Sequence, residues 1–366
     1  MRKVGRLIGV VDPFVAALMG VVVLAYLLPC SGRLAIFFDF AADSGIVLLF
    51  FLHGAKLSRE AILGGMLHWR LHLVTLTITF VVFPVLGLLL IRMPGLDPSM
   101  AAGLLYLTFL PSTVQSSIAF TSIAGGNVPA AVCAATLSNL LGMFLTPLLV
   151  AIFMQVPGTQ SPPLGNLSPS SLSTVSLDSI KSIALQLLLP FLVGHLASPW
   201  LSGLFSRHKS LIGRVDRGAI LLVVYTAFSA SIVGGLWSRL SFLTLLVLVF
   251  ISCGLLGFVI GICRVFSQCL RLNREDSIVL LFCGSKKSLA SGVPIAGTLF
   301  PASEVGLMIL PLMIFHQIQL IACAAIARRL AKETSKSSDE KAADGTSPKC
   351  ESGLLANATR NSRNIG

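Results

Sequence analysis

The chain has 366 residues, of which 55% are hydrophobic and 11% charged, and its mean hydropathy is +0.88. Soluble globular domains carry about 25% charged residues, so the composition excludes an ordinary water-soluble fold. The net charge of +12 would suit a nucleic-acid-binding protein, but the basic residues lie in short clusters between apolar stretches. We therefore expect a membrane protein whose partner is the lipid bilayer and not a nucleic acid.

Apolar stretches long enough to cross a hydrocarbon core of about 30 Å as a helix recur along the whole chain. Backbone polar groups in lipid must be satisfied within the segment, which predicts an all-α polytopic protein. Charged and Gly- or Pro-containing breaks separate ten predicted spans, at residues 11–30, 40–57, 67–91, 99–124, 128–154, 179–200, 217–238, 241–265, 274–300 and 303–329. The first stretch also has the basic start of a signal peptide, but Pro29 is not the small residue that a cleavage site needs, so we count this stretch as a span.

Basic residues are distributed unequally between the two sides of this ten-span arrangement. Fifteen lie on the side of the N-terminus, whereas the opposite side has only Arg33, Arg92, Lys181 and Arg239. Cytoplasmic loops are enriched in Lys and Arg, so both termini are predicted to lie in the cytoplasm. The short loops fit a multi-pass protein of the cell membrane, either an inner or a plasma membrane.

A Ser- and Pro-rich segment at residues 155–178 contains no basic residue and divides the spans five and five. We predict that it is an external linker between two five-helix repeats, at residues 1–154 and 179–330. Because five is odd, the second repeat would be inverted relative to the first. A short match between Ser117-Ile-Ala119 and Ser288-Leu-Ala290, each in the fourth span of its half, supports this repeat. Residues 331–366 are charged and Ser-rich and are predicted to be a disordered cytoplasmic tail.

The fourth span contains a proline followed by a cluster of hydroxyl and amide groups. Pro111 removes a helical hydrogen bond and clashes with the preceding turn, which breaks or kinks the helix. Freed carbonyls and the ends of two half-helices can bind ions or small anions at the membrane midplane. A packed kink satisfied by Ser and Thr is the alternative. The candidate binding residues of this span are Pro111, Ser112, Thr113, Gln115, Ser116 and Ser117.

The ninth span places two lysines among serines, glycines and a proline. A lysine at membrane depth is costly unless it snorkels, pairs or lines a wet cavity. Neighbouring helical residues point about 100° apart, so the two lysines are not expected to serve one site. Snorkelling to the cytoplasmic interface is the alternative interpretation. The candidate binding residues here are Ser285, Lys286, Lys287 and Ser288.

Polar residues in the fifth and tenth spans are placed to face the two interrupted spans. The candidates are Thr136, Ser138 and Asn139 in the fifth span and His316 and Gln317, with Gln319 nearby, in the tenth. Hydrogen bonds between helices account for them equally well. No carboxylate lies deep in any predicted span, which argues against a carboxylate proton relay, although Asp43 at the opening of the second span stays a candidate. His53 and His195 are expected to be interfacial or packed.

Enzyme motifs are absent from the sequence, among them G-x-S-x-G, H-E-x-x-H, G-x-G-x-x-G and the P-loop. His68 and His72 have the spacing of a metal pair, but Trp69 stands where a zincin has its glutamate. The eight cysteines include no C-x-x-C pair. We therefore expect a protein that is not an enzyme and has no catalytic residue and no bound transition metal.

Three motifs resemble the bile acid:sodium symporter superfamily (solute carrier family 10). They are Phe51-Leu-His53-Gly54 ahead of Leu57-Ser58, the run from Leu110 to Ser117, and Gly284-Ser285-Lys286-Lys287-Ser288-Leu-Ala290. The last is similar to the branch with member 7 and its bacterial relatives, the SBF-like transporters, and the resemblance covers Val11 to Arg329. It implies ten helices in two inverted five-helix repeats, core and panel domains, and broken helices 4 and 9 that cross. It also implies alternating access by movement of the core against the panel.

The resemblance implies sodium as a coupling ion, with Gln115, Ser116, Thr136 and Ser138 as its candidate ligands, and no other cofactor. The chain departs from the sodium-coupled pattern in the ninth helix. Phe282 replaces an acidic residue, and Lys286 and Lys287 replace a Gln-Asn pair, so two ligand positions lack oxygen. A lysine ammonium either takes the place of a bound cation, which makes transport sodium-independent, or attracts an anionic substrate.

These features together predict a secondary active transporter of a small organic anion or related solute, with sodium symport suggested by the resemblance. Two alternatives stay open. One is a regulatory membrane protein of cation homeostasis, particularly of calcium, and the other is a cation/proton antiporter.

Overall fold

The computed structural model describes residues 13–55, 68–93, 96–154, 187–235 and 241–343. Every regular element within these ranges is a helix, which confirms the prediction of an all-α protein. In chain order the elements are α2 (Pro13–Leu27), α3 (Arg33–Ala55), α5 (Trp69–Thr77), the π-helical turn η2 (Ile78–Val82), α6 (Phe83–Leu90), α7 (Pro98–Phe109), α8 (Gln115–Ile123), α9 (Val128–Phe153), α11 (Leu189–Arg207), α12 (Lys209–Val233), α13 (Phe242–Cys269), α14 (Arg274–Gly284), α15 (Leu289–Leu299) and α16 (Ala302–Ala343).

Seven helical segments among the described residues are long and apolar enough to cross a membrane. They are Arg33–Ala55, Trp69–Leu90, Val128–Phe153, Ser210–Val233, Phe242–Cys269, Arg274–Leu299 and Ala302–Glu333, and the shorter helices α2 and α7 are also apolar. Each coincides with a predicted span. The predicted linker at 155–178 and the start of the predicted sixth span lie outside the described residues, so the ten-helix inverted repeat stays a prediction.

Several predicted boundaries are wrong. Helix α11 continues to Arg207, beyond the predicted end at 200, and α12 begins at Lys209, ahead of the predicted start at 217. Helix α3 begins at Arg33, so Asp43 lies inside this helix and not at its opening, and its side chain is exposed. Helix α16 continues to Ala343, so the first part of the segment predicted to be a disordered tail is helical. This extension is rich in Ala, Lys and Glu, which are good helix formers. Residues 344–366 of the predicted tail lie outside the described residues.

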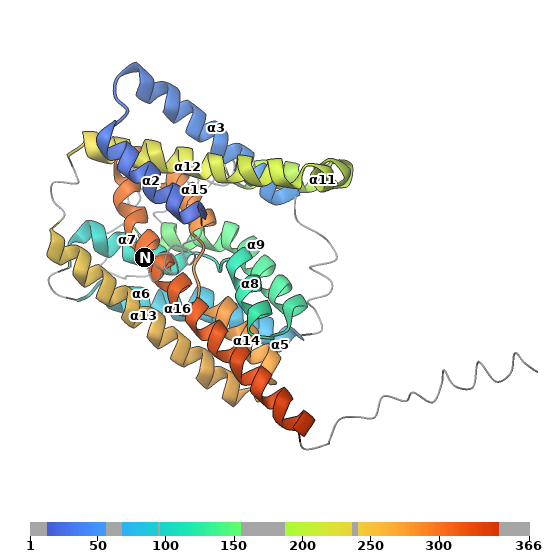
Figure 1. Cartoon of the computed structure of the whole chain (residues 1–366). Coiled ribbons are helices and arrows are strands. Elements are labelled where there is room, and N and C mark those ends of the chain that lie inside the picture. The colour runs from blue at the N-terminus through green and yellow to red at the C-terminus, as the bar shows by residue number, and fades with distance from the viewer. Residues whose placement is uncertain (1–12, 56–67, 94–95, 155–186, 236–240, 344–366) are drawn as a thin grey trace, which may run out of the picture.

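The helices form two groups (Figure 1). Helices α2, α3, α11 and α12 form the first group, in which α11 packs along α3 and α12 contacts both α2 and α3. The second group contains α5 to α9 and α13 to α16, and α12 joins the two groups through its contacts with α15 and α16. Large apolar side chains on the outer faces, such as Phe40, Trp200 and Phe250, are 73%, 83% and 75% exposed. Such surfaces suit contact with lipid.

Two glycines let the backbones of α3 and α11 approach closely. A Cβ atom on Gly54 would collide with the carbonyl oxygen of Phe191, and one on Gly194 would collide with the carbonyl oxygen of Phe51. The contact is reciprocal, because each glycine faces the residue three positions before the other glycine. Helices in lipid gain little from the hydrophobic effect when they associate, so close packing at small residues carries more of the stabilisation.

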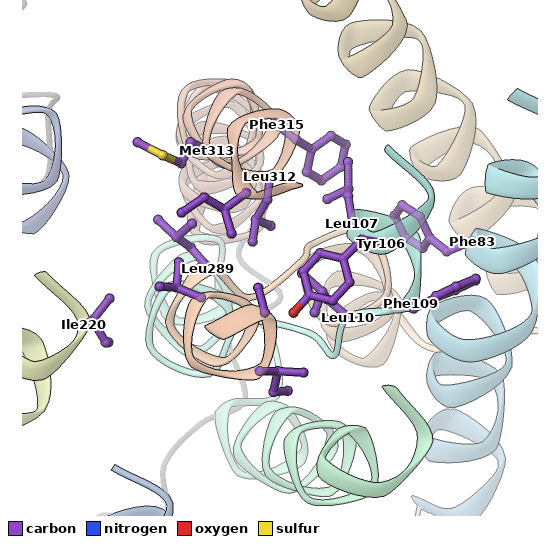
Figure 2. Packing of buried hydrophobic residues seen from close by; sticks show 14 of the residues in the cluster. Phe83, Tyr106, Leu107, Phe109, Leu110, Ile220, Leu289, Leu312, Met313 and Phe315 are labelled. Atoms are coloured by element: carbon purple, nitrogen blue, oxygen red, sulfur yellow. The ribbon is translucent and has the colours of Figure 1, made fainter. Parts of the chain in front are cut away.

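The predicted fourth and ninth spans are both interrupted, and the two interruptions meet. Residues 110–114 separate α7 from α8, and residues 285–288 separate α14 from α15. Pro111 explains the first interruption, because it lacks an N–H and holds Leu110 in an extended conformation with a ψ of 153°. The Ser288 N–H donates to the carbonyl of Pro111 at 2.8 Å. Leu110 and Leu289, the chain neighbours of these two residues, belong to a cluster of buried apolar side chains that includes Tyr106 and Leu312 (Figure 2).

A third irregularity lies in the helix formed by α5, η2 and α6. The Phe83 N–H donates to the carbonyl of Ile78, five residues back, which is the π-helical pattern. The Thr79 carbonyl therefore loses its α-helical donor, Phe83. Its π-helical donor would be Pro84, which has no N–H. A buried carbonyl in this position must accept a hydrogen bond from elsewhere.

We predict that Gly54→Ala or Gly194→Ala destabilises the protein by about 1–3 kcal/mol, the usual cost of forcing a methyl group into a packed contact. The measurement is the thermal unfolding midpoint of the detergent-purified protein. Gly257→Ala is the matched control, because a Cβ atom there meets nothing within 4 Å in the exposed face of α13. If Gly54→Ala and Gly257→Ala unfold at the same temperature, the close approach of α3 and α11 does not stabilise the fold.

Candidate functional site

The carbonyl groups at the end of α7 have no helical donors, and other parts of the chain satisfy them. Thr146 Oγ1 of α9 donates to the Phe109 carbonyl at 2.8 Å. In a continuous helix the Ser112 N–H would donate to the Thr108 carbonyl. It donates instead to Ser138 Oγ at 3.0 Å. The carbonyls of Leu110 and Pro111 accept hydrogen bonds from Lys287 and Ser288 of the second interruption, which joins the two broken helices.

The side chain of Lys287 binds three of the carbonyls that the helices leave without donors. Its Nζ lies 2.9 Å from the Thr79 oxygen, 2.8 Å from the Thr108 oxygen and 2.7 Å from the Leu110 oxygen. Three acceptors require three N–H donors, so the amine carries its proton and is an ammonium. It also lies 4.0 Å from the centre of the Phe83 ring. The side chain is fully buried and has no ion pair among the described residues.

The backbone of Lys287 is held by Gln319 of α16. The Lys287 N–H donates to Gln319 Oε1 at 2.8 Å, and Gln319 Nε2 donates to the Lys287 carbonyl at 2.8 Å. These two bonds fix the orientation of the amide, so its nitrogen also faces His316 Nδ1, 2.8 Å away. His316 Nδ1 must then accept a hydrogen bond, which assigns the tautomer with the proton on Nε2. Residues 285–288 contain no proline that would break the helix. The Gln319 amide instead holds the backbone of Lys287 in its non-helical conformation.

The side chain of Lys286 points to a different place. Its Nζ donates to Ser116 Oγ at 3.2 Å and lies 4.5 Å from the centre of the Phe120 ring and 5.7 Å from that of Phe282. It is as deeply buried as Lys287, but one hydroxyl is its only hydrogen-bond partner in the described part of the chain. An ammonium has three donors, so the coordination of Lys286 is less complete than that of Lys287.

A directed chain of hydroxyl groups begins at Lys286. Ser117 Oγ donates its only hydrogen to the Phe282 carbonyl at 3.0 Å, so Thr113 Oγ1 must donate to Ser117, and Ser116 donates to Thr113. The hydrogens of Ser116 and Thr113 are therefore used inside this chain. These two hydroxyls present only oxygen lone pairs to any neighbouring ligand.

A cavity of about 1140 Å³ lies between the two helix groups. It reaches from the two interruptions to the connection between α11 and α12. Apolar side chains from both groups line it, including those of Phe14, Met143, Phe191, Ile220 and Leu320. The cavity is thus large enough for an organic molecule and is walled mainly by apolar groups.

The polar parts of the cavity lie at its two ends. At the interruptions, the first residues of α8 and α15, Gln115 and Leu289, line the cavity, and α8 begins without a side-chain cap. Helix N-termini carry partial positive charge and N–H donors. At the other end the cavity is lined by Arg214, Asp216 and Arg217. Cationic groups therefore outnumber anionic ones along the cavity.

The structure divides the predicted site residues into three sets. Those that line the cavity are Thr113, Gln115, Ser116, Thr136, Asn139, Ser288 and His316. Those buried behind it are Ser112, Ser117, Ser138, Ser285, Lys286 and Lys287, while Pro111 lines a small neighbouring pocket. The predicted Gln317 lies outside the cavity wall, and its buried Nε2 has no hydrogen-bond partner among the described residues.

Several residues of the site were not predicted. Lys287 binds the backbone carbonyls of Thr79 and Thr108, and the hydroxyl of Thr146 donates to the last carbonyl of α7. The sequence signal for the unpaired carbonyl of Thr79 was Pro84, which cannot donate a hydrogen bond. Ser291, which donates to Asn139 Oδ1 at 2.6 Å, was also missed. His53, expected to be interfacial or packed, lines the cavity and bonds to the carbonyl of Leu49. The ring of His195 lies parallel to that of Phe191, with the ring centroids 6.4 Å apart.

We predict that Gln319→Leu destabilises the protein, because it leaves the buried N–H and carbonyl of Lys287 unsatisfied at about 1–3 kcal/mol for each group. The thermal unfolding midpoint checks this. Gln317→Leu on the same helix is the control and should be neutral or stabilising, since it removes a donor that has no partner in the described structure. Equal midpoints for the two variants would contradict the role of Gln319.

Comparison with known proteins identifies the family. The model of the SBF-like CPA transporter family (DUF4137) matches residues 12–332. The Escherichia coli (strain K12) protein named "Putative symporter YfeH" is 50% identical over 331 residues, which are 90% of this chain and 96% of the relative. "Sodium/bile acid cotransporter 7" of Danio rerio and of Rattus norvegicus is 27% identical over 75% of this chain, covering 80% and 78% of those relatives. The resemblance inferred from the motifs is thereby confirmed: the chain belongs to the SBF-like CPA transporter family and is a multi-pass membrane transporter.

Proposed function

We propose that the protein is a secondary active transporter that moves a small organic anion across the membrane by alternating access, with the cavity between the two helix groups as its substrate site. The single observation that carries this proposal is the convergence of two helix N-termini, of α8 and α15, on one end of a mostly apolar cavity. The names of the relatives, a symporter and sodium/bile acid cotransporters, support solute transport.

The anionic charge of the substrate follows from the groups around the cavity. The hydrogens of the Ser116 and Thr113 hydroxyls are already used, so other groups must donate to an anionic group. The backbone N–H groups at the start of α8, which has no side-chain cap, can do so, as can the amide N–H groups of Gln115 and Asn139 in the cavity wall. Arg214 and Arg217 at the other end attract anions toward the cavity. The apolar wall suits the carbon body of the solute.

Lys286 supports an anion from behind the cavity wall. It does not line the cavity, because Ser116 lies between its ammonium and the open space. In this low-dielectric environment its charge acts through Ser116 over several ångströms, and no carboxylate of the described residues neutralises it. Lys286 is thus a positioning residue that stabilises negative charge without touching the substrate.

Sodium does not fit the candidate ligand set well. Ser138 Oγ is bonded to the backbone of Ser112 and lies away from the cavity. Ser116 Oγ accepts from the ammonium of Lys286, so a sodium ion on the same oxygen would lie next to a like charge. We propose that anion transport proceeds without sodium bound to Gln115, Ser116, Thr136 and Ser138.

We predict that organic anions, but not matched neutral or cationic analogues, stabilise the detergent-purified protein. The probes are carboxylates, sulfonates and sulfate esters with aliphatic or aromatic bodies, each paired with an amide, alcohol and amine of the same body. A ligand at about 100 times its dissociation constant adds roughly 2.7 kcal/mol to the stability of the folded state. Lys286→Met should weaken this stabilisation, while Lys332→Met, at an exposed position of α16 far from the cavity lining, should leave it unchanged.

Equal stabilisation by anions, amides and amines, or full anion binding by Lys286→Met, would contradict the proposal. Anions that pass this screen are then tested for uptake into proteoliposomes. The two other functions give different results in the same preparation. Stabilisation by calcium alone, with no solute uptake, would favour a regulator of calcium, and release of protons on addition of sodium would favour antiport.

A further inference from the structure

The oxygen atoms around the ammonium of Lys287 all belong to the main chain. They come from two separate helices, the π-helical turn η2 and the end of α7. The Thr79 carbonyl lacks a helical donor because of Pro84, and the carbonyls of Thr108 and Leu110 lack one because α7 ends at Pro111. We call the oxygens of Thr79, Thr108 and Leu110, together with the Phe83 ring, the carbonyl cage.

The carbonyl cage is a place of strong negative potential. Its oxygens carry the negative ends of peptide dipoles, two of them at the C-terminus of α7, and the face of an aromatic ring adds to the field. Without a cation, these buried oxygens would be unsatisfied and would repel one another. Rings of backbone carbonyls are the ligands by which potassium channels replace the hydration shell of a monovalent cation. The cage therefore has the chemistry of a monovalent cation site.

We propose that the carbonyl cage is a monovalent cation site that the protein fills with its own cation, the ammonium group of Lys287. When this side chain is removed, a free cation of similar size, such as potassium, ammonium or methylammonium, binds there instead. The distances of 2.7–2.9 Å from Nζ to the oxygens match a cation as large as ammonium. Calcium takes oxygens at about 2.3–2.6 Å and usually needs carboxylates, which the cage lacks.

This site has a consequence for ion dependence. In the wild-type protein the cage is always occupied, so the meeting point of the two broken helices needs neither sodium nor potassium for its stability. The Gln319 amide holds the Lys287 backbone independently of the side chain, so truncation at this position empties the cage and keeps the interruption in place. The inference does not depend on the proposed substrate, because it concerns stability in the absence of any solute.

The test compares thermal unfolding midpoints in chloride salts of choline, sodium, potassium, ammonium and methylammonium at constant ionic strength. Wild type should unfold at the same temperature in all five salts. Lys287→Ala should unfold at a lower temperature in choline and regain about half or more of the loss in ammonium, methylammonium or potassium, with a saturable dependence on concentration. Lys287→Met, which removes the charge but fills the space, should be destabilised in every salt.

A second variant and two outcomes keep the inference testable. Lys286→Ala, beside the cage but with a single hydroxyl partner, should show no recovery specific to any cation. If Lys287→Ala folds only when it is purified in ammonium or potassium, the inference is supported. Equal midpoints for Lys287→Ala in choline and in every cation, or failure to fold in all of them while Lys287→Met folds, would overturn it.

Discussion

A backbone carbonyl inside a membrane must receive a hydrogen bond, and this requirement determines how the centre of the molecule is built. Pro111 ends α7, and Pro84 follows a π-helical turn, so several buried carbonyls lose their helical donors. The chain supplies the missing donors from distant positions, with Lys287 and Thr146 as the main examples. These bonds hold the two interrupted helices against each other. The starts of α8 and α15 can face one cavity only because the ends of α7 and α14 are held in this way.

The two neighbouring lysines have separate roles because the chain between α14 and α15 is not helical. Lys287 has as many acceptors as its ammonium has hydrogens, and it stabilises the meeting point of the helices. Lys286 has one hydroxyl acceptor and two aromatic rings, and its charge lies one side chain away from the cavity. A buried charge with few partners is costly, and such groups in membrane proteins are usually functional. Because of this difference in coordination, we assign a structural role to Lys287 and the attraction of an anionic solute to Lys286.

The sequence predicted the helices from apolar length and the first interruption from Pro111, which are local signals. The second interruption was expected from the resemblance of the Gly284–Ala290 motif to the symporter superfamily. The sequence also placed the two lysines in different environments, but from the angle between neighbouring helical residues, whereas residues 285–288 are not helical. It did not predict the partners of either lysine, since those depend on how residues 285–288 turn after the helix ends. Gln319 was noted beside Gln317, but only the packing of α16 against the interruption separates the residue that binds Lys287 from the one that does not. The extension of α16 was missed because its composition is polar, and helix propensity and disorder have similar signals in such a segment.

A ligand shell made of main-chain atoms has a consequence for how this protein can change during evolution. Substitution of Thr79, Thr108 or Leu110 replaces a side chain but keeps the carbonyl that faces the cage. Substitutions at these three positions therefore cannot retune the oxygen ligands gradually, as they can in a site built from carboxylates or hydroxyls, and the Phe83 ring is the side-chain part of the cage. Position 287 is the point at which a single codon change decides whether the shell holds its own cation or takes one from solution. Within this fold, a gain or loss of ion dependence at the shell would be abrupt and reversible.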